Sequence, residues 1–169
     1  MLESFEIMIY KRQSQGGKLM IWLMALPNGL LSFKFLEIKF KSENYVEIMQ
    51  LYAITIIKIN FGEDFYFQED NCSVYKSKYT KNFIEEIGIS IIPWPAQSLH
   101  LNIVENIWKL ISDDVFDGPQ FHSKHQLKKK IEEVITNIIT NERCKIIQLF
   151  SSVRCRLVEV IRNNGNIIN

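Results

Sequence analysis

The chain has 169 residues, enough for one ordinary domain with its own hydrophobic core. Hydrophobic residues make up 47% and charged residues 23%, a composition that excludes a disordered or fibrous protein. The 20 basic and 19 acidic side chains nearly balance, so the overall charge favours neither a nucleic acid nor a membrane as partner.

The first forty residues have the pattern of three β-strands. Segments 5–10 and 18–26 are rich in β-branched, aromatic and methionine side chains, and Gln15-Gly16-Gly17 between them is typical of a turn. Pro27-Asn28-Gly29 is a second turn signal, and a third strand is predicted over 31–40. The simplest arrangement of these strands is an antiparallel meander.

Helices and short strands alternate in the next part of the chain. A helix is predicted over 42–57 with Ser42 as its N-cap, because apolar residues recur there at three- and four-residue steps. An aromatic strand over 64–69 is followed by a helix over 76–87 and a short strand over 89–93. This alternation predicts a mixed sheet covered by helices.

Three amphipathic helices are predicted in the rest of the chain. Apolar residues recur at helical steps over 101–115, and Asp117-Gly118-Pro119 ends that helix. Two further helices are predicted over 123–140 and 143–162. Three cysteines without Cys-x-x-Cys spacing favour a reducing compartment, and neither a membrane span nor a secretory signal is expected.

The charge is unevenly distributed along the chain. Residues 1–120 carry 11 basic and 15 acidic side chains, whereas 121–169 carry nine basic and four acidic ones. A basic end is a mild indication of an anionic partner. We expect two parts, a sheet-containing part over 1–118 and a helical extension of the same domain over 119–169.

Two carboxylates are the candidates for chemistry. Asp70 stands where the aromatic strand ends, and Glu105 lies off the apolar stripe of its helix, 34 residues further along. Hard divalent cations take oxygen ligands, and two carboxylates from neighbouring elements are a common minimal site. From the spacing alone, a turn-capping aspartate and a solvated helical glutamate are the favoured interpretation.

The segments around these carboxylates carry two long motifs. Residues 93–108 read P-W-P-A-Q-S-L-H-L-N-I-V-E-N-I-W, and residues 67–71 read F-Q-E-D-N. The chain resembles the mariner-superfamily (Tc-type) DDE transposases, whose signatures are W-P-[AS]-Q-S-P-D-L-N-P-[IL]-E-N-[LV]-W and F-Q-[QE]-D-N. A gap of 34 residues between the two carboxylates is a spacing of that family, and weaker similarity extends from residue 15 to the C-terminus.

The resemblance implies an RNase H-like α/β fold: a mixed sheet with flanking helices, truncated at its N-terminus, followed by C-terminal helices. It implies that Asp70 and Glu105 are the second and third members of a catalytic triad that binds Mg²⁺ or Mn²⁺, two ions to a site. The implied activity is cleavage and strand transfer of transposon DNA, with transposon ends and target DNA as partners. A homo-oligomer or a full-length transposase is a further implied partner, and the nucleus is the implied compartment.

The start of the chain departs from the family. The first catalytic aspartate of the family lies in a strand that reads D-E-S-x-F, and Leu2 stands at its place when Glu3 and Ser4 are aligned with that motif. Glu6 and Glu3 are the nearest substitutes. The family's N-terminal DNA-binding helices have no match either. We therefore expect an inactive catalytic-domain fragment, with a sheet that lacks its central first strand, or a non-enzymatic binding remnant.

Other residue types have open interpretations. The candidates for weak contacts with DNA phosphates are Lys128, Lys129, Lys130, Arg154 and Arg156. The same residues fit the solvated faces of two amphipathic helices. His122 and His125 are expected to serve a loop and a helix start, and Trp94 and Trp108 to pack in the core.

Overall fold

The computed structural model describes residues 2–4, 8–10, 19–36, 39–62, 65–69, 72–93, 101–118 and 120–163. Contacts divide the chain into two compact units. The sheet unit comprises Met1–Leu26 with Ser32–Ala96, and the helical unit comprises Pro27–Leu31 with Gln97–Asn169. This division falls before the helix that was predicted over 101–115, which therefore groups with the two later helices.

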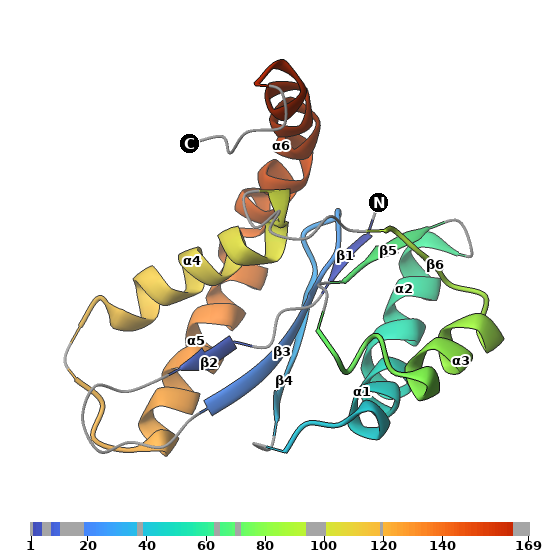
Figure 1. The fold of residues 1–169 in the computed structure, drawn as a ribbon. Coiled ribbons are helices and arrows are strands. Elements are labelled where there is room, and N and C mark those ends of the chain that lie inside the picture. Colours follow the sequence, from blue (N-terminus) through green and yellow to red (C-terminus); the bar gives the residue numbers. More distant parts are fainter. Residues whose placement is uncertain are drawn as a thin grey trace. The chain divides into compact units, whose positions relative to one another are not determined.

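The strands are β1 (Leu2–Ser4), β2 (Met8–Tyr10), β3 (Leu19–Ala25), β4 (Leu31–Leu36), β5 (Tyr66–Gln68) and β6 (Ser90–Ile91) (Figure 1). The helices are α1 (Ser42–Ile48), the π-helix η1 (Met49–Ala53), α2 (Ile54–Phe61), α3 (Lys78–Glu86), α4 (Ile103–Phe116), α5 (Lys124–Asn141) and α6 (Arg143–Arg162). The helices and strands predicted from periodicity are confirmed within a few residues at their ends.

The six strands in the described part of the chain form one mixed sheet, as predicted. The order is β2-β3-β1-β5-β6, and β4 pairs with β3. Both β1 and β2 pair antiparallel with β3, whereas β1 pairs parallel with β5 and β5 parallel with β6. The expectation that the central first strand would be missing is wrong, because Leu2–Ser4 forms β1 between β3 and β5. Three residues are sufficient, since a strand pairs through its backbone whatever its side chains are.

Strand β3 is the centre of the sheet core. Its sequence is a nearly continuous apolar run, and Ile21, Trp22 and Leu23 are fully buried. Successive strand residues point to opposite faces, so burial of consecutive residues means that both faces of β3 are covered. This explains why the segment lacks the alternation of a half-exposed strand.

The segments α1, η1 and α2 follow one another as one long helical stretch beside the sheet (Figure 1). Its buried stripe, Tyr45, Met49, Ala53 and Ile57, recurs at four-residue steps, and all four side chains are fully buried. Four-residue steps overshoot the 3.6-residue turn of an α-helix, so such a stripe drifts around the helix. The wider turn of η1 reduces that drift and keeps the four side chains on the buried side.

The start of α1 corrects one prediction. The N-cap is Lys41, not Ser42, and the side-chain Oδ1 of Asn44 accepts the backbone N–H of Lys41 at 3.1 Å. The Ser42 hydroxyl instead donates to the backbone carbonyl of Val74 at 3.5 Å. The helix therefore begins one residue earlier than the serine signal suggested, because asparagine at its third position satisfies the cap.

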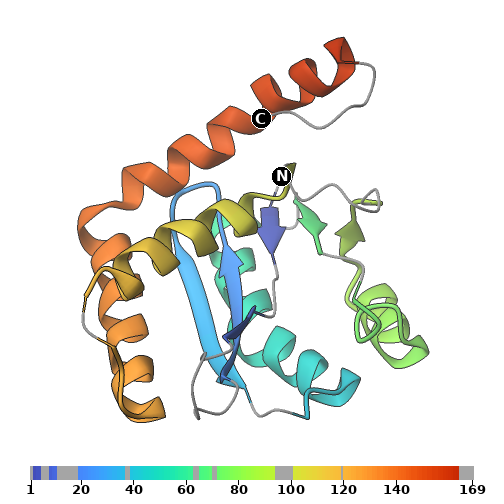
Figure 2. The same ribbon diagram turned by 60° about the vertical axis from the view of Figure 1, so that its left-hand side comes forward.

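In the helical unit, α4 contacts α5 and α6, and α5 contacts α6. The interior is formed by apolar side chains from all three helices, among them Ile107, Trp108, Ile111, Ile131, Ile135, Ile138 and Ile146. Figure 2 shows the second half of α6 extending past the ends of α4 and α5. The buried stripe of α5, formed by Ile131, Val134, Ile135 and Ile138, confirms that this helix is amphipathic, and the core role of Trp108 is confirmed. Within the described part of the chain, no helix is long and apolar enough to span a membrane.

Candidate functional site

The end of β5 leads directly to the predicted metal ligand Asp70. Phe67 is fully buried, Gln68 is 1% exposed and Glu69 is 9% exposed. The hydroxyl of Tyr45 in α1 donates to Oε2 of Glu69 at 2.8 Å. Asp70 and Asn71 lie outside the described residues, so the role of Asp70 stays a prediction.

Strand β1 lies next to β5 in the sheet. Leu2 pairs with Phe67 and Glu3 pairs with Gln68 in parallel register. The alignment of Glu3 and Ser4 with the family motif, which stays a prediction from the sequence, would put the first carboxylate position on this strand. This position holds leucine in the present chain.

Glu105 lies in the first turn of α4 and is half-buried. Asn102 is the N-cap, and its Oδ1 accepts the backbone N–H of Val104 at 3.1 Å. The side chain of Asn106 donates to the carbonyl of Asn102 at 3.1 Å. The side chain and the carbonyl of Asn102 therefore both hold the first turn, which carries Glu105. The helix dipole also favours a carboxylate in this turn.

Glu105 belongs to the helical unit and Asp70 to the sheet unit. Among the residues that the structure describes, no group of three or more histidine, cysteine, aspartate or glutamate side chains is placed to hold a metal ion. The predicted pair of carboxylates therefore rests on the sequence motifs.

The basic candidates differ in how accessible their charges are. Lys129 is exposed and lies 3.9 Å from Glu133, an ordinary surface ion pair, whereas Lys128 and Lys130 are half-buried. Arg154 is exposed on α6. Arg156 is half-buried, and its Nη2 donates to the carbonyl of Leu149 on the same helix at 3.3 Å. Lys129 and Arg154 thus present the most accessible charges of the five.

The histidines lie at the start of α5. The backbone N–H of His122 donates to the side chain of Gln126 at 2.8 Å, and the hydroxyl of Ser123 caps the helix by accepting the N–H of Gln126 at 3.2 Å. His125 is exposed in the first turn. These are the loop and helix-start positions that the sequence predicts, whereas Trp94 lies outside the described residues.

Sequence reasoning missed the contact between Tyr45 and Glu69. Tyr45 was visible only as one apolar residue of a helical stripe, and Glu69 only as a neighbour of Asp70. The sequence feature that could have indicated this contact is a tyrosine on the buried face of a helix. A buried tyrosine hydroxyl needs a hydrogen-bond partner. Which partner it takes, 24 residues away, is decided by the fold.

Comparison with known families decides the relationship. The model of a family described as DDE superfamily endonuclease matches residues 8–128, which is more than half of the chain. The chain belongs to this family. The match begins in β2 and ends in α5, so it includes the end of β5 and the first turn of α4, the two places where the predicted carboxylates lie.

Curated relatives of this DDE domain are transposases of nematode transposable elements. The Tc3 transposase of Caenorhabditis elegans is 28% identical over 166 residues, which cover 97% of this chain and 50% of the relative. The Tc1 transposase of the same species is 26% identical over 98 residues, covering 56% of this chain and 34% of the relative. The chain thus spans about half the length of the Tc3 transposase.

Solved structures share the fold. The catalytic domain of Mos1 transposase, in a structure with raltegravir and Mn, superposes with a TM-score of 0.81 at 12% identity, covering 99% of this chain and 84% of that one. A Mos1 paired-end complex with the left transposon end has a TM-score of 0.77 at 14% identity, covering 95% of this chain and 48% of that one. The RNase H-like fold is confirmed.

Proposed function

We propose that this chain is a transposase-derived DDE endonuclease and strand-transferase domain for transposon DNA, and that it is inactive in cleavage. The observation that carries this proposal is the pairing of Leu2 with Phe67 in β1. When Glu3 and Ser4 are aligned with the family motif D-E-S-x-F, Leu2 stands at the place of the first metal-binding aspartate, and this alignment supports the proposal. Inactivity follows from the chemistry of that position, since a leucine side chain has no oxygen to offer a cation.

The remaining donors fit a divalent ion in chemical type. Asp70 and Glu105 offer the oxygen ligands that Mg²⁺ and Mn²⁺ prefer, and Glu105 is accessible at the start of α4. Structures of the Mos1 catalytic domain with Mn and with Mg support this choice of metal. A bound divalent ion supplies Lewis-acid stabilisation of phosphoryl displacement.

Two carboxylates do not fit the arrangement with two ions. Removing even an outer-shell partner of a metal typically costs about 10–100-fold in affinity or activity, so the lack of a direct ligand should cost more. In this chain, Asp70 and Glu105 would orient and neutralise one cation. We therefore expect weak binding of one Mn²⁺ ion and no turnover.

The test combines metal binding with DNA nicking. Electron paramagnetic resonance of Mn²⁺ should show weak binding that is lost in both Asp70→Asn and Glu105→Gln. Supercoiled plasmid DNA incubated with the protein and Mn²⁺ should stay uncut. Leu2→Asp is the matched gain-of-ligand variant, and tighter Mn²⁺ binding is expected there. Plasmid nicking by the unaltered protein that disappears in Asp70→Asn and Glu105→Gln would overturn the inactivity.

Glu3 provides a sharper version of the same test. It is the neighbour of Leu2 on β1 and pairs with Gln68. If the unaltered protein nicks DNA and Glu3→Gln stops it, Glu3 has replaced the missing aspartate. Under the proposal, Glu3→Gln leaves Mn²⁺ binding unchanged.

A second candidate function is non-enzymatic binding of nucleic acid or of a transposase. The exposed basic side chains of Lys129 and Arg154 support binding of nucleic acid. The Mos1 paired-end complexes with transposon ends support DNA as the partner. A second copy of the chain or a full-length transposase is the protein partner that we propose, and the nucleus, where chromosomal DNA lies, is the proposed compartment.

A further inference from the structure

We infer that Tyr45 is a positioning residue for Asp70. Its side chain contacts residues on both sides of the Asp70–Asn71 segment, Glu69 before it and Tyr75 after it. The inference rests on the proposed function insofar as Asp70 is taken as a metal ligand. The anchoring contacts themselves lie within the described residues of the sheet unit.

The upstream contact is the hydrogen bond from the Tyr45 hydroxyl to Glu69 Oε2, 2.8 Å long. Tyr45 is fully buried and Glu69 is 9% exposed, so the bond is largely shielded from water. A buried carboxylate is costly without hydrogen-bond partners, and a hydrogen bond to a charged group is stronger than one between neutral groups. The end of β5 is thereby tied to α1 at the residue that precedes Asp70.

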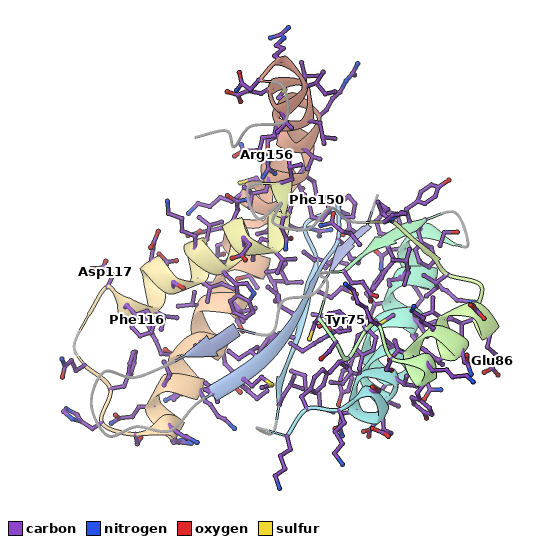
Figure 3. All side chains as sticks on the ribbon, in the orientation of Figure 1. Tyr75, Glu86, Phe116, Asp117, Phe150 and Arg156 are labelled. Carbon is purple, nitrogen blue, oxygen red and sulfur yellow. The ribbon has the colours of Figure 1, made fainter. Side chains whose placement is uncertain are left out.

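The downstream contact is aromatic. The rings of Tyr45 and Tyr75 have centroids 4.6 Å apart and planes inclined at 50°. Tyr75 is 2% exposed and lies in the interior of the sheet unit, beside α1 (Figure 3). Its backbone N–H donates to the carbonyl of Cys72 at 3.1 Å, which closes the turn that follows the Asp70–Asn71 segment.

The same turn is held from two helices. The carbonyl of Val74 accepts the hydroxyl of Thr80 in α3 at 2.8 Å and the hydroxyl of Ser42 in α1 at 3.5 Å. Thr80 is fully buried, and its backbone N–H in turn donates to Ser77. The turn that begins at Cys72 is therefore held in place, and Tyr45 contacts a residue on each side of the Asp70–Asn71 segment.

Tyr45 is itself well placed for this role. It begins the fully buried stripe that continues through Met49, Ala53 and Ile57, so its ring has a rigid base. A ligand binds a metal tightly only when the groups that support it are held in place. Removal of the Tyr45 hydroxyl should leave α1 intact. It should remove only the hydrogen bond to Glu69, the residue before the Asp70–Asn71 segment.

The experiment compares Tyr45→Phe with Tyr79→Phe, a control on α3 whose ring is 55% exposed. Hydrogen exchange is followed in peptides that cover 65–75, and Mn²⁺ binding is measured on the same samples. For Tyr45→Phe we expect exchange at 68–72 to accelerate about tenfold or more. Mn²⁺ affinity should fall about tenfold or more, and exchange in β3 should stay as in the unaltered protein. Tyr79→Phe should change none of these.

Substitutions of Glu69 separate positioning from general stability. The side-chain oxygen of glutamine still accepts a hydroxyl, so Glu69→Gln should retain slow exchange at 68–72, whereas Glu69→Ala should match Tyr45→Phe. Unchanged exchange at 68–72 in Tyr45→Phe overturns the anchor. Faster exchange throughout β3 as well overturns it too, because Tyr45 would then support the fold in general.

The metal measurement distinguishes the two proposals. If Asp70→Asn loses Mn²⁺ binding and Tyr45→Phe does not, Tyr45 does not position Asp70 although the metal site is real. If Asp70→Asn binds Mn²⁺ as well as the unaltered protein does, the metal site is overturned, and hydrogen exchange alone decides whether Tyr45 holds the segment.

Discussion

Arg143, the first residue of α6, donates from its side-chain Nε to the backbone carbonyl of Asn28 at 2.6 Å. The two residues are 115 positions apart and belong to the same helical unit. Gly29 directly follows Asn28 in the chain and has a φ of 83°. A Cβ on Gly29 would stand 2.5 Å from Cγ and 2.8 Å from the carbonyl oxygen of Arg143. The turn predicted from Pro27-Asn28-Gly29 is thus also a tertiary contact that requires glycine.

Gly29→Ala should lower the free energy of unfolding by about 2–4 kcal/mol, because it combines a left-handed backbone conformation with a clash against backbone. Gly88→Ala is the matched control, since Gly88 has a φ of 70° but a Cβ added there would meet no heavy atom within 4 Å. It should cost only about 1 kcal/mol. Urea unfolding of the three proteins measures both values, and equal losses in the two variants would contradict the steric argument.

Loss of the α4 cap should weaken both the helix and the candidate metal site. In Asn102→Ala, the N–H of Val104 loses its acceptor, which should cost about 1 kcal/mol. Asn102→Asp keeps an oxygen acceptor and should stay close to the unaltered protein in stability. Because Glu105 lies in the same turn, Mn²⁺ binding should fall in the alanine variant and persist in the aspartate variant. Equal stability of the alanine variant and the unaltered protein would contradict the capping role.

The ion pair between Glu142 and Lys145 should make stability depend on pH. Hydrogen bonding to Lys145 lowers the pKa of the Glu142 carboxyl below its usual value, and the same bond raises the pKa of the Lys145 ammonium group. The glutamate contribution is therefore present above the pKa of the unfolded chain and is lost as the pH falls through the lower folded pKa. The lysine contribution is present below the unfolded pKa and is lost as the pH rises through the higher folded pKa.

Lys145 is exposed and Glu142 is half-buried at the surface, so solvent screens the pair and the effect should be small. Glu142→Gln should reduce the shift of the urea midpoint between neutral and acidic pH. Glu133→Gln, which removes the longer pair with Lys129, is the control and should leave that shift nearly unchanged. An identical acid response of the unaltered protein and Glu142→Gln would show that the pair does not contribute.

Salt dependence should reveal which basic side chains meet DNA. Each lost phosphate contact lowers the slope of log affinity against log salt by about 0.9. Lys129→Ala and Arg154→Ala should each show such a change in fluorescence anisotropy with duplex DNA. Arg156→Ala is the control, because its guanidinium donates to Leu149 and should change the slope less. Absence of DNA binding at about 50 mM salt would remove the basis for this candidate function.

Much of the secondary structure follows from local patterns. The helices α4, α5 and α6 could be located because apolar residues recur at three- and four-residue steps, and Ser123 marks the start of α5 in both sequence and structure. The incorrect N-cap at α1 is also a local effect. Lys41 is the N-cap instead of Ser42 because the side chain of Asn44 accepts the backbone N–H of Lys41. The motifs around Asp70 and Glu105 indicated the family, which the comparison then confirmed.

The sequence by itself determined the periodic helices, the turn at Asn28-Gly29 and the family motifs, since each depends on residues within a few positions of one another. Only the tertiary structure decided that Leu2–Ser4 is a central strand and that Tyr45 meets Glu69. Strand pairing is made by backbone groups that are alike in every residue, and buried polar contacts join residues that are far apart in the chain. Strand pairing and buried polar contacts therefore have no pattern in the local sequence, and they are seen only in the folded structure.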